Sequence, residues 1–294
     1  MSNVALPHHY TGKVRELYEV GHERMLVVAS DRISVFDVVL GDAIPDKGRV
    51  LTALSTFWFD ATAAIVPNHL VSADPTDFPE TAGSDIAGRA MLVRAASPVR
   101  LECVARGYLF GSAWKDYEAT GSVQGRALPT GLAQAERLTS PIFTPTTKAE
   151  QGHDLPLSDV DAAALVGDEV FEQLRDLTLR VYEFGAQLAL SRGVILADTK
   201  LEFGTIDGNL LVIDEMLTPD SSRYWPAEDY QVGISPPSFD KQYVRDHYLS
   251  IGWNQEPPAP PLPAAVIEAT RSKYVEAYEL ITGASFDEWH GEEP

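Results

Sequence analysis

The sequence has one cysteine and no apolar run long enough to cross a bilayer. Cys103 cannot form an intrachain disulfide, which favours a reducing cytoplasm as the location of the protein. It lies in an apolar, strand-like run, so we interpret it as a buried structural thiol and not as a nucleophile. The first residues, MSNVALPHHYTG, lack the features of a signal peptide.

Positive charge is also scarce. The chain has 23 lysines and arginines against 43 acidic residues, a net charge of −20. This balance argues against nucleic-acid partners and anionic membranes, both of which select basic surfaces. The chain contains neither of the standard phosphate-binding loops, GxxxxGK[ST] or GxGxxG. If its substrates carry phosphates, local cations or a bound metal must supply the attraction, and three of the few lysines, Lys13, Lys148 and Lys200, lie in candidate motifs.

The residues LADTKLEFG and LVIDEMLTPDSSRYWP predict two strands joined by a tight turn at residues 207–209. Strand side chains alternate between faces, so Asp198, Lys200 and Glu202 share one face, while apolar residues take the other. Pairing around the turn brings Glu202 near Asp214, and two carboxylates suit a hard divalent cation. A solvated edge hairpin with a salt bridge to Lys200 is the alternative.

Two further segments are candidates for binding anions. Residues 11–39 predict a β meander of three strands, and Gly12 is followed by Lys13 and Arg15 on one face, a pattern that can cover a polyphosphate. A basic strand that faces solvent is the alternative. Downstream, Arg106 ends a strand, and residues 111–112 begin a helix whose N–H groups favour anions. Ser112 as an ordinary helix cap is the competing explanation.

Apolar residues at helical spacing, together with residues that start or stop helices, predict four further helices. We expect the first of them to have a packing role only. Residues 128–156 predict a long ordered loop over a site, because proline, threonine and glycine are frequent there and apolar side chains need burial. His153 in this loop is not predicted to be a metal ligand. The expected helices cover residues 50–65, 168–191, 240–251 and 263–282.

Six segments together resemble the successive motifs of the SAICAR synthetase family, in that family's order. They are GKVRELYEV, SDRISVFD, ECVARGYLFGSAWKDY, PIFTPTTKAEQGHD, LADTKLEFG and VIDEMLTPDSSRYWP, spread from about residue 11 to residue 226. The pairing of LADTKLEFG with DEMLTPDSSRYWP is highly specific. One departure is Thr199, where the family pattern has a bulkier apolar residue; we expect little effect, because this side chain faces away from the acidic face.

The resemblance implies an α+β fold related to ATP-grasp enzymes and protein kinases, with ATP held between two lobes. It implies a β-rich lobe over residues 1–100 as one wall of the ATP cleft, and a mixed lobe over 101–254 with the substrate and metal sites. Residues 255–294 are then a proline linker and a terminal helix packed on the body. The implied partners are small molecules, and the expected assembly is a monomer or small homo-oligomer.

The resemblance also implies a reaction, the joining of 5-amino-1-(5-phosphoribosyl)imidazole-4-carboxylate to L-aspartate with hydrolysis of ATP. Phosphoryl transfer needs positioning and charge neutralisation, so lysine, arginine and Mg²⁺ are the expected parts, and an acyl phosphate is the expected intermediate. By resemblance, Asp198 and Lys200 are catalytic, with Lys200 steadying the transferring group. A small-molecule kinase is the alternative function, although the chain lacks an HRD-type catalytic loop.

The site residues implied by the resemblance fall into four groups. ATP phosphates are covered by Gly12, Lys13 and Arg15; magnesium is bound by Glu202 and Asp214; aspartate lies near Lys148, His153 and Asp154; and the ribotide is held by Arg106, Gly111, Ser112, Asp198, Lys200, Ser222 and Arg223. Ser112 and Arg223 are expected at the ribotide phosphate.

Overall fold

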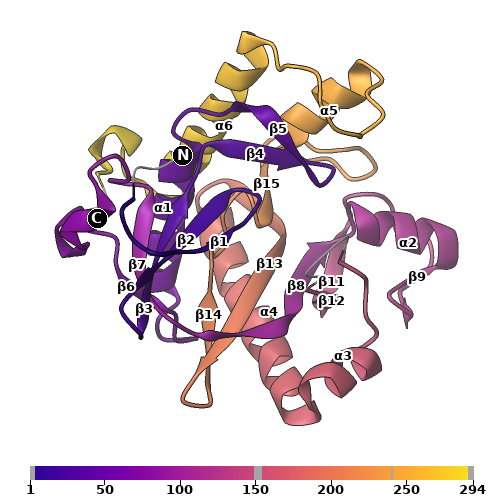
Figure 1. The fold of residues 1–294 in the computed structure, drawn as a ribbon. Helices are drawn as coiled ribbons and strands as arrows, with labels where there is room; N and C mark the ends of the chain where they lie inside the picture. The colour runs from indigo at the N-terminus through magenta and orange to yellow at the C-terminus, as the bar shows by residue number, and fades with distance from the viewer. Residues whose placement is uncertain (1–3, 149–153, 240, 291–294) are drawn as a thin grey trace.

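The computed structural model describes residues 4–148, 154–239 and 241–290. Two antiparallel sheets, each with one long helix against it, organise the chain (Figure 1). This mixture of segregated strands and helices confirms the expected α+β class. No helix among the described residues is long and apolar enough to cross a membrane.

The first sheet has the strand order β1-β2-β3-β7-β6. Helix α1 (Lys47–Ala61) packs on its strands β3 and β7. The predicted meander is correct for its first two strands and wrong for the third, because Phe36 and Asp37 have positive φ and form a turn inside VFDVVL. The sheet strands are β1 (His8–Thr11), β2 (Arg15–Val20), β3 (Arg24–Ala29), β6 (Leu70–Ser72) and β7 (Ala90–Arg94).

That turn joins two strands of a separate hairpin, β4 (Arg32–Val35) and β5 (Val38–Ala43), which packs against the C-terminal part of the chain. After a bend at Pro257-Pro258, residues 259–263 pass the hairpin, where the backbone N–H of Leu262 donates to Asp42. Two helices flank this segment, α5 (Gln242–Ser250) and α6 (Ala264–Thr282), and α6 packs along α1 (Figure 1). Short 3-10 turns complete this half: Pro75–Asp77, Glu80–Ala82 and Phe286–Glu288.

The second sheet has the order β11-β8-β13-β14, with β15 also paired to β13 and β12 to β8. Its long central strands, β8 (Ser97–Tyr108) and β13 (Val194–Ile206), pair from Ser97 opposite Thr205 to Arg106 opposite Asp198. Asp207 and Gly208, both with positive φ, close the predicted hairpin to β14. The remaining strands are β11 (Arg137–Phe143), β12 (Thr146–Thr147), β14 (Asn209–Ile213) and β15 (Ser222–Pro226), and β9 (Ser122–Val123) pairs separately with β10 (Arg126–Ala127).

Helix α4 (Asp168–Ser191) has the predicted bounds and covers one face of the second sheet. Its most buried side chains include Phe171, Leu174 and Val181, which face the apolar side of β13. The shorter α3 (Asp159–Val166) precedes it and is capped by Ser158, whose side chain accepts from the N–H of Asp161. The opposite face of the sheet is therefore the one left for polar chemistry.

Two sequence predictions are wrong in detail. The predicted loop over residues 128–156 contains β11 and β12, since tertiary pairing with β8 overrides the proline-rich and threonine-rich composition. Helix α1 begins at Lys47, three residues before the predicted start, although Gly48 reads as a turn residue. The Asp31 carboxylate accepts from the N–H of Gly48 at 2.9 Å and satisfies one donor of the first turn.

Candidate active site

The polar face of β13 carries the predicted residues Asp198, Lys200 and Glu202, and its other face carries buried Leu201 and Phe203. The alternation expected from the sequence is therefore confirmed. Asp198 pairs in register with Arg106 of β8 and with Arg223 of β15. All the chemistry described below is arranged around this one strand face.

Glu102 of β8, which was not predicted as a site residue, lies directly opposite Glu202 in the ladder. Like charges at opposed positions destabilise a sheet unless a cation lies between them. Lys200 supplies that cation: its Nζ donates to Glu102 Oε1 at 2.5 Å and to Glu202 Oε1 at 3.2 Å. Burial alone would lower the pKa of Lys200, but Glu202 and Glu102 together raise it above its usual value, so the ammonium is not a proton acceptor.

Lys148, which follows β12, also forms an ion pair with Glu202. Burial alone would raise the pKa of Glu202, but Lys200 and Lys148 hold it at about 2. The segment predicted to lie near the aspartate site thus reaches the carboxylate predicted to bind metal. Asp154 is exposed beyond β12, and His153 lies outside the described residues.

Arg15 of β2 connects the first sheet to the acidic end of the hairpin. Its guanidinium is buried and donates to Asp214 Oδ2 at 3.0 Å and to Glu215 Oε2 at 2.6 Å. The expected same-face pairing of Lys13 with Arg15 is not observed. Lys13 precedes the strand and forms an exposed ion pair with Asp37. Because Arg15 is buried, the alternative of a basic strand that faces solvent is wrong for Arg15.

Asp214 has a raised pKa of about 6. Burial is the largest cause; the carboxylates of Glu202 and Glu215 add to it, and Arg15 opposes it. Behind Asp214, the buried imidazole of His69 hydrogen-bonds its backbone carbonyl, and burial lowers the pKa of His69 to about 3, so the ring is neutral. Asp214 is thus a carboxylate whose negative charge the surrounding residues do not fully compensate.

A cationic corner forms at the other end of the strand face. Arg106 donates to Asp198 Oδ2 at 3.0 Å, and Arg223 pairs with the same oxygen. Arg106 also donates to Thr144 at 2.9 Å and to the Ser112 hydroxyl at 3.3 Å. One carboxylate therefore serves two guanidinium groups, and the corner retains a net positive charge.

The corner abuts the N-terminus of helix α2 (Ser112–Thr120), where Gly111 occupies the cap position. The φ of Gly111 is +62°, a conformation that favours glycine, and a Cβ there would lie 2.8 Å from a guanidinium nitrogen of Arg223. Gly111 is the cap residue and Ser112 is the first residue of the helix, so the plain-cap explanation of Ser112 is wrong. Helix N–H groups and two arginines thus converge on one place.

Ser222 is not brought to this corner. In the ladder it pairs with Thr199, and its hydroxyl donates to Thr199 Oγ1 at 2.8 Å. Both side chains lie on the buried face, opposite Asp198. The threonine that departs from the family pattern thus has a local partner.

A buried ionic cluster behind the site was also missed. Lys47 of α1 is fully buried and pairs with Asp220 at 2.7 Å, and Lys241 approaches the same carboxylate at 3.2 Å. The Tyr274 hydroxyl of α6 donates to Asp220 at 2.7 Å. Burial alone would raise the pKa of Asp220, but the two lysines lower it, so the carboxylate is ionised. The loop that leads to Arg223 is thereby fixed to α1 and α6.

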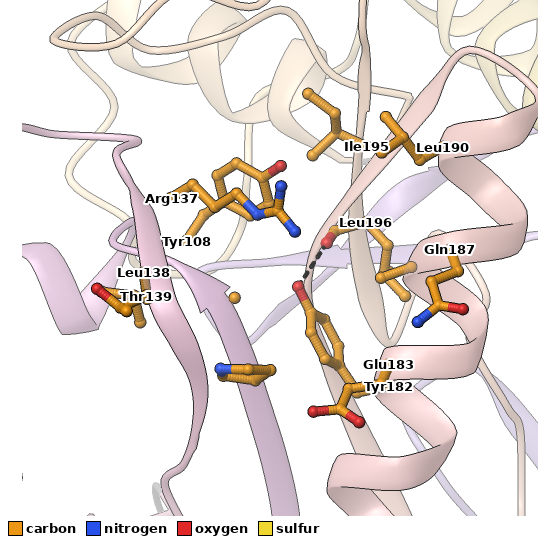
Figure 2. A pocket seen from close by; sticks show the side chains of 13 residues that line it. Tyr108, Arg137, Leu138, Thr139, Tyr182, Glu183, Gln187, Leu190, Ile195 and Leu196 are labelled. Atoms are coloured by element: carbon orange, nitrogen blue, oxygen red, sulfur yellow. Dashed lines mark hydrogen bonds between the residues drawn. The ribbon is translucent and has the colours of Figure 1, made fainter.

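A cavity of about 340 Å³ lies elsewhere, between β11 and α4 on the helix-covered side of the second sheet (Figure 2). Tyr108 and Arg137 border one side of it, and Tyr182, Glu183 and Gln187 of α4 border the other. The cavity contains none of the predicted site residues.

The sequence profile of the SAICAR synthetase family matches residues 8–260. A phosphoribosylaminoimidazole-succinocarboxamide synthase of Saccharopolyspora erythraea is 55% identical over 289 residues, 96% of this chain and 96% of that protein. A SAICAR synthase structure from Saccharomyces cerevisiae, complexed with SAICAR, is 39% identical with a TM-score of 0.88 and covers 95% of this chain and 96% of that one.

A SAICAR synthetase structure in complex with ADP is 23% identical, with a TM-score of 0.70 over 94% of this chain and 98% of that one, and supports the fold alone. The profile match and the identity to curated relatives extend over nearly the whole chain and include both ends of the β13 face. The chain belongs to the SAICAR synthetase family.

Proposed function

We propose that this chain joins 5-amino-1-(5-phosphoribosyl)imidazole-4-carboxylate to L-aspartate, converting ATP to ADP and phosphate. The observation that carries the proposal is that, in a chain of this family, the polar face of β13 has two chemically different ends. A cationic corner around Asp198 lies at one end, and a cluster of carboxylates with Lys200 lies at the other. A phosphorylated carboxylic acid needs an anion site beside a phosphoryl-transfer site, and this face provides both.

We assign the ribotide to the cationic corner. Arg106, Arg223, Ser112 and the N–H groups that follow Gly111 suit its phosphate, because charge-assisted donors and a helix N-terminus converge there. Asp198 orients both guanidinium groups and presents its second oxygen to the ligand. Ser222 acts through Thr199 from the buried face, and not through its own hydroxyl at the ligand.

We assign Mg²⁺ to Glu202 and Asp214. Burial and the neighbouring carboxylates of Glu202 and Glu215 raise the pKa of Asp214, so a bound cation would offset the cost of its charge, and carboxylate oxygens are the donors that Mg²⁺ prefers. The described residues contain no group of three or more His, Cys, Asp or Glu side chains placed for a metal, so ATP oxygens and water complete the shell. When bound, the ion neutralises charge on the transferring phosphoryl group.

ATP lies, in this proposal, against residues 12–15. Lys13 is exposed just before β2 and can exchange its partner Asp37 for a phosphate. Arg15 stays with Asp214 and Glu215, and so joins the ATP-covering strand to the metal carboxylates. The N–H of Gly12 donates to the carbonyl of Arg15 and closes the turn between β1 and β2. Because Gly12 has no side chain, the ATP phosphates can approach this turn closely.

The reaction then has two steps. A carboxylate oxygen of the ribotide attacks the γ-phosphorus, the bond to ADP breaks, and an acyl phosphate forms. The aspartate amine attacks the acyl carbon, phosphate leaves with that oxygen, and the amine loses a proton. Lys200, held by Glu102 and Glu202, remains charged throughout and stabilises the negative charge on the transferring group.

We place L-aspartate near Lys148 and Asp154, at the mouth of the site. Lys148 is half-exposed, and within the described part of the chain its ammonium pairs with Glu202, so it can turn to a substrate carboxylate when metal occupies Glu202. The predicted cytoplasmic location and the monomer or small homo-oligomer remain predictions.

ADP release with ATP, Mg²⁺, the ribotide and L-aspartate, each omitted in turn, tests the proposal. We expect ADP to accumulate over many turnovers only when all four are present. Sustained ADP formation that does not depend on aspartate would favour the small-molecule kinase instead.

A further inference from the structure

The ladder between β8 and β13 ends at the Arg106–Asp198 pair, and beyond it the strands separate. On one side, residues 137–142 of β11 span only residues 106–108 of β8, so β11 bows away and leaves the cavity of Figure 2. On the other side, the pairing of β13 with β15 shifts register between Leu196 and Asp198. The two site residues therefore stand at the fork of two irregular ladders.

Tyr182 of α4 fills this fork from the helix-covered side. Its hydroxyl donates to the carbonyl of Leu196 at 2.9 Å, as the dashed line in Figure 2 shows, and lies 3.5 Å from the carbonyl of Ala197. It also accepts a hydrogen bond from the backbone N–H of Gly107. These are the neighbours of Asp198 and Arg106 in sequence, so one hydroxyl joins the two strands where their own pairing stops.

Tyr182 packs so closely on Gly107 that there is no room for a side chain at residue 107. A Cβ on Gly107 would lie 1.9 Å from the Tyr182 hydroxyl oxygen and 2.7 Å from the ring carbon that bears it. Tyr182 is itself buried, and burial raises the pKa of its hydroxyl, which therefore remains a donor at all working pH values. The contact is thus permanent and sterically specified.

We propose that Tyr182 is a positioning residue, whose hydroxyl fixes the fork between β8 and β13 and thereby sets the distance between Arg106 and Asp198. This inference rests on the proposed assignment of the ribotide to that corner. The positioning role of Tyr182 would mean that ribotide specificity depends in part on α4, which covers the opposite face of the sheet and does not contact the ligand. The neutral hydroxyl acts on the corner indirectly, by hydrogen bonds to the backbone of residues 107 and 196.

The test is Tyr182→Phe, with Tyr248→Phe as the matched control. Tyr248 is equally buried, and its hydroxyl likewise donates to a backbone carbonyl, that of Pro260 at 2.8 Å, but it lies in α5 away from the corner. We expect Tyr182→Phe to raise the KM for the ribotide roughly tenfold, less than the ~100-fold that a 1 Å misplacement can cause. The KM values for ATP and aspartate should change less than about twofold, which is small on the free-energy scale of binding.

Amide hydrogen exchange supplies a reading that does not depend on the reaction. Exchange at Gly107 and Asp198 should be faster in Tyr182→Phe than in wild type, and unchanged in Tyr248→Phe. Unchanged exchange, or equal increases in all three KM values, would overturn the positioning role. A wild-type protein that fails to turn over ribotide and aspartate would instead overturn the proposed function, while the exchange result would still decide the role of Tyr182.

Discussion

Asp214→Asn should stabilise the protein in the absence of ligands, although it removes a proposed magnesium ligand. The pKa of Asp214 rises from 3.8 to about 6 on folding, so its ionised form is disfavoured in the folded state. A shift of roughly two units corresponds to about 3 kcal/mol of lost stability once pH exceeds the folded pKa. The neutral amide avoids this penalty, and Arg15 keeps Glu215 as its partner.

The pH dependence follows from the sign of the shift. Because the folded pKa lies above the unfolded one, the folded protein binds more protons between about pH 4 and pH 6, and wild-type stability falls as pH rises through this window. About half of the penalty, roughly 1.5 kcal/mol, accrues between pH 5 and pH 8. The asparagine variant lacks this loss.

Thermal or urea unfolding of both proteins at pH 5 and pH 8, without nucleotide or metal, measures the difference. We expect the advantage of Asp214→Asn to grow by about 1.5 kcal/mol between these values, or roughly 2–3 °C in Tm for a chain of this length. Asp207→Asn, in the exposed turn of the same hairpin, is the matched control and should show no such growth. A constant difference between wild type and Asp214→Asn across pH would refute the reasoning, and so would a loss of stability at pH 8.

Three further outcomes follow from the site. Glu202→Gln should raise the Mg²⁺ concentration for half-maximal activity roughly tenfold or more, about 1.4 kcal/mol, while folding normally; identical magnesium titrations would remove Glu202 from the metal site. Asp220→Asn leaves Lys47 buried without its charged partner and should cost about 3–5 kcal/mol of unfolding free energy, whereas Tyr274→Phe, which removes one neutral donor to the same carboxylate, should cost about 1 kcal/mol. Arg223→Ala should weaken ribotide binding by about 1.5–3 kcal/mol and leave the KM for ATP unchanged, and an equal loss for both substrates would contradict the assignment of the corner.

Local sequence signals predicted the elements whose pattern is self-contained. Helix α4 has the expected bounds because its apolar residues recur at helical spacing between two glycines. The β13–β14 hairpin follows from alternation and from Asp207-Gly208, which tolerate positive φ. The polar face of Asp198, Lys200 and Glu202 is a direct consequence of the two-residue period.

Residues that act through distant pairing were not accessible to the same reasoning. Glu102 joins the site only because β8 aligns with β13, about a hundred positions away, so nothing adjacent to it in sequence marks it. Lys47 reads as a turn residue beside Pro45 and Gly48, yet it is buried against Asp220. Alternation along β15 would have indicated that Ser222 and Arg223 face opposite ways, a signal that was present in the sequence.

The charge balance of the chain also has a structural answer. With a net charge of −20, the molecule as a whole repels phosphates. The site offsets this repulsion locally through the positive charges of Arg106, Arg223 and Lys200. Their acidic partners lie on the paired strands β8 and β13, which hold the three cations at the site. The negative charge of Asp214, in contrast, is disfavoured by burial and by two neighbouring carboxylates, and the proposed Mg²⁺ would offset this cost.

The central claim is that ATP activates the ribotide carboxylate by phosphorylation. It can be measured by running the reaction with ribotide labelled with ¹⁸O in the carboxylate and analysing the released phosphate by mass spectrometry. We expect one labelled oxygen in each phosphate formed, in proportion to the amide product. Phosphate that carries no label would mean that water, and not the carboxylate, receives the phosphoryl group, and would contradict the account.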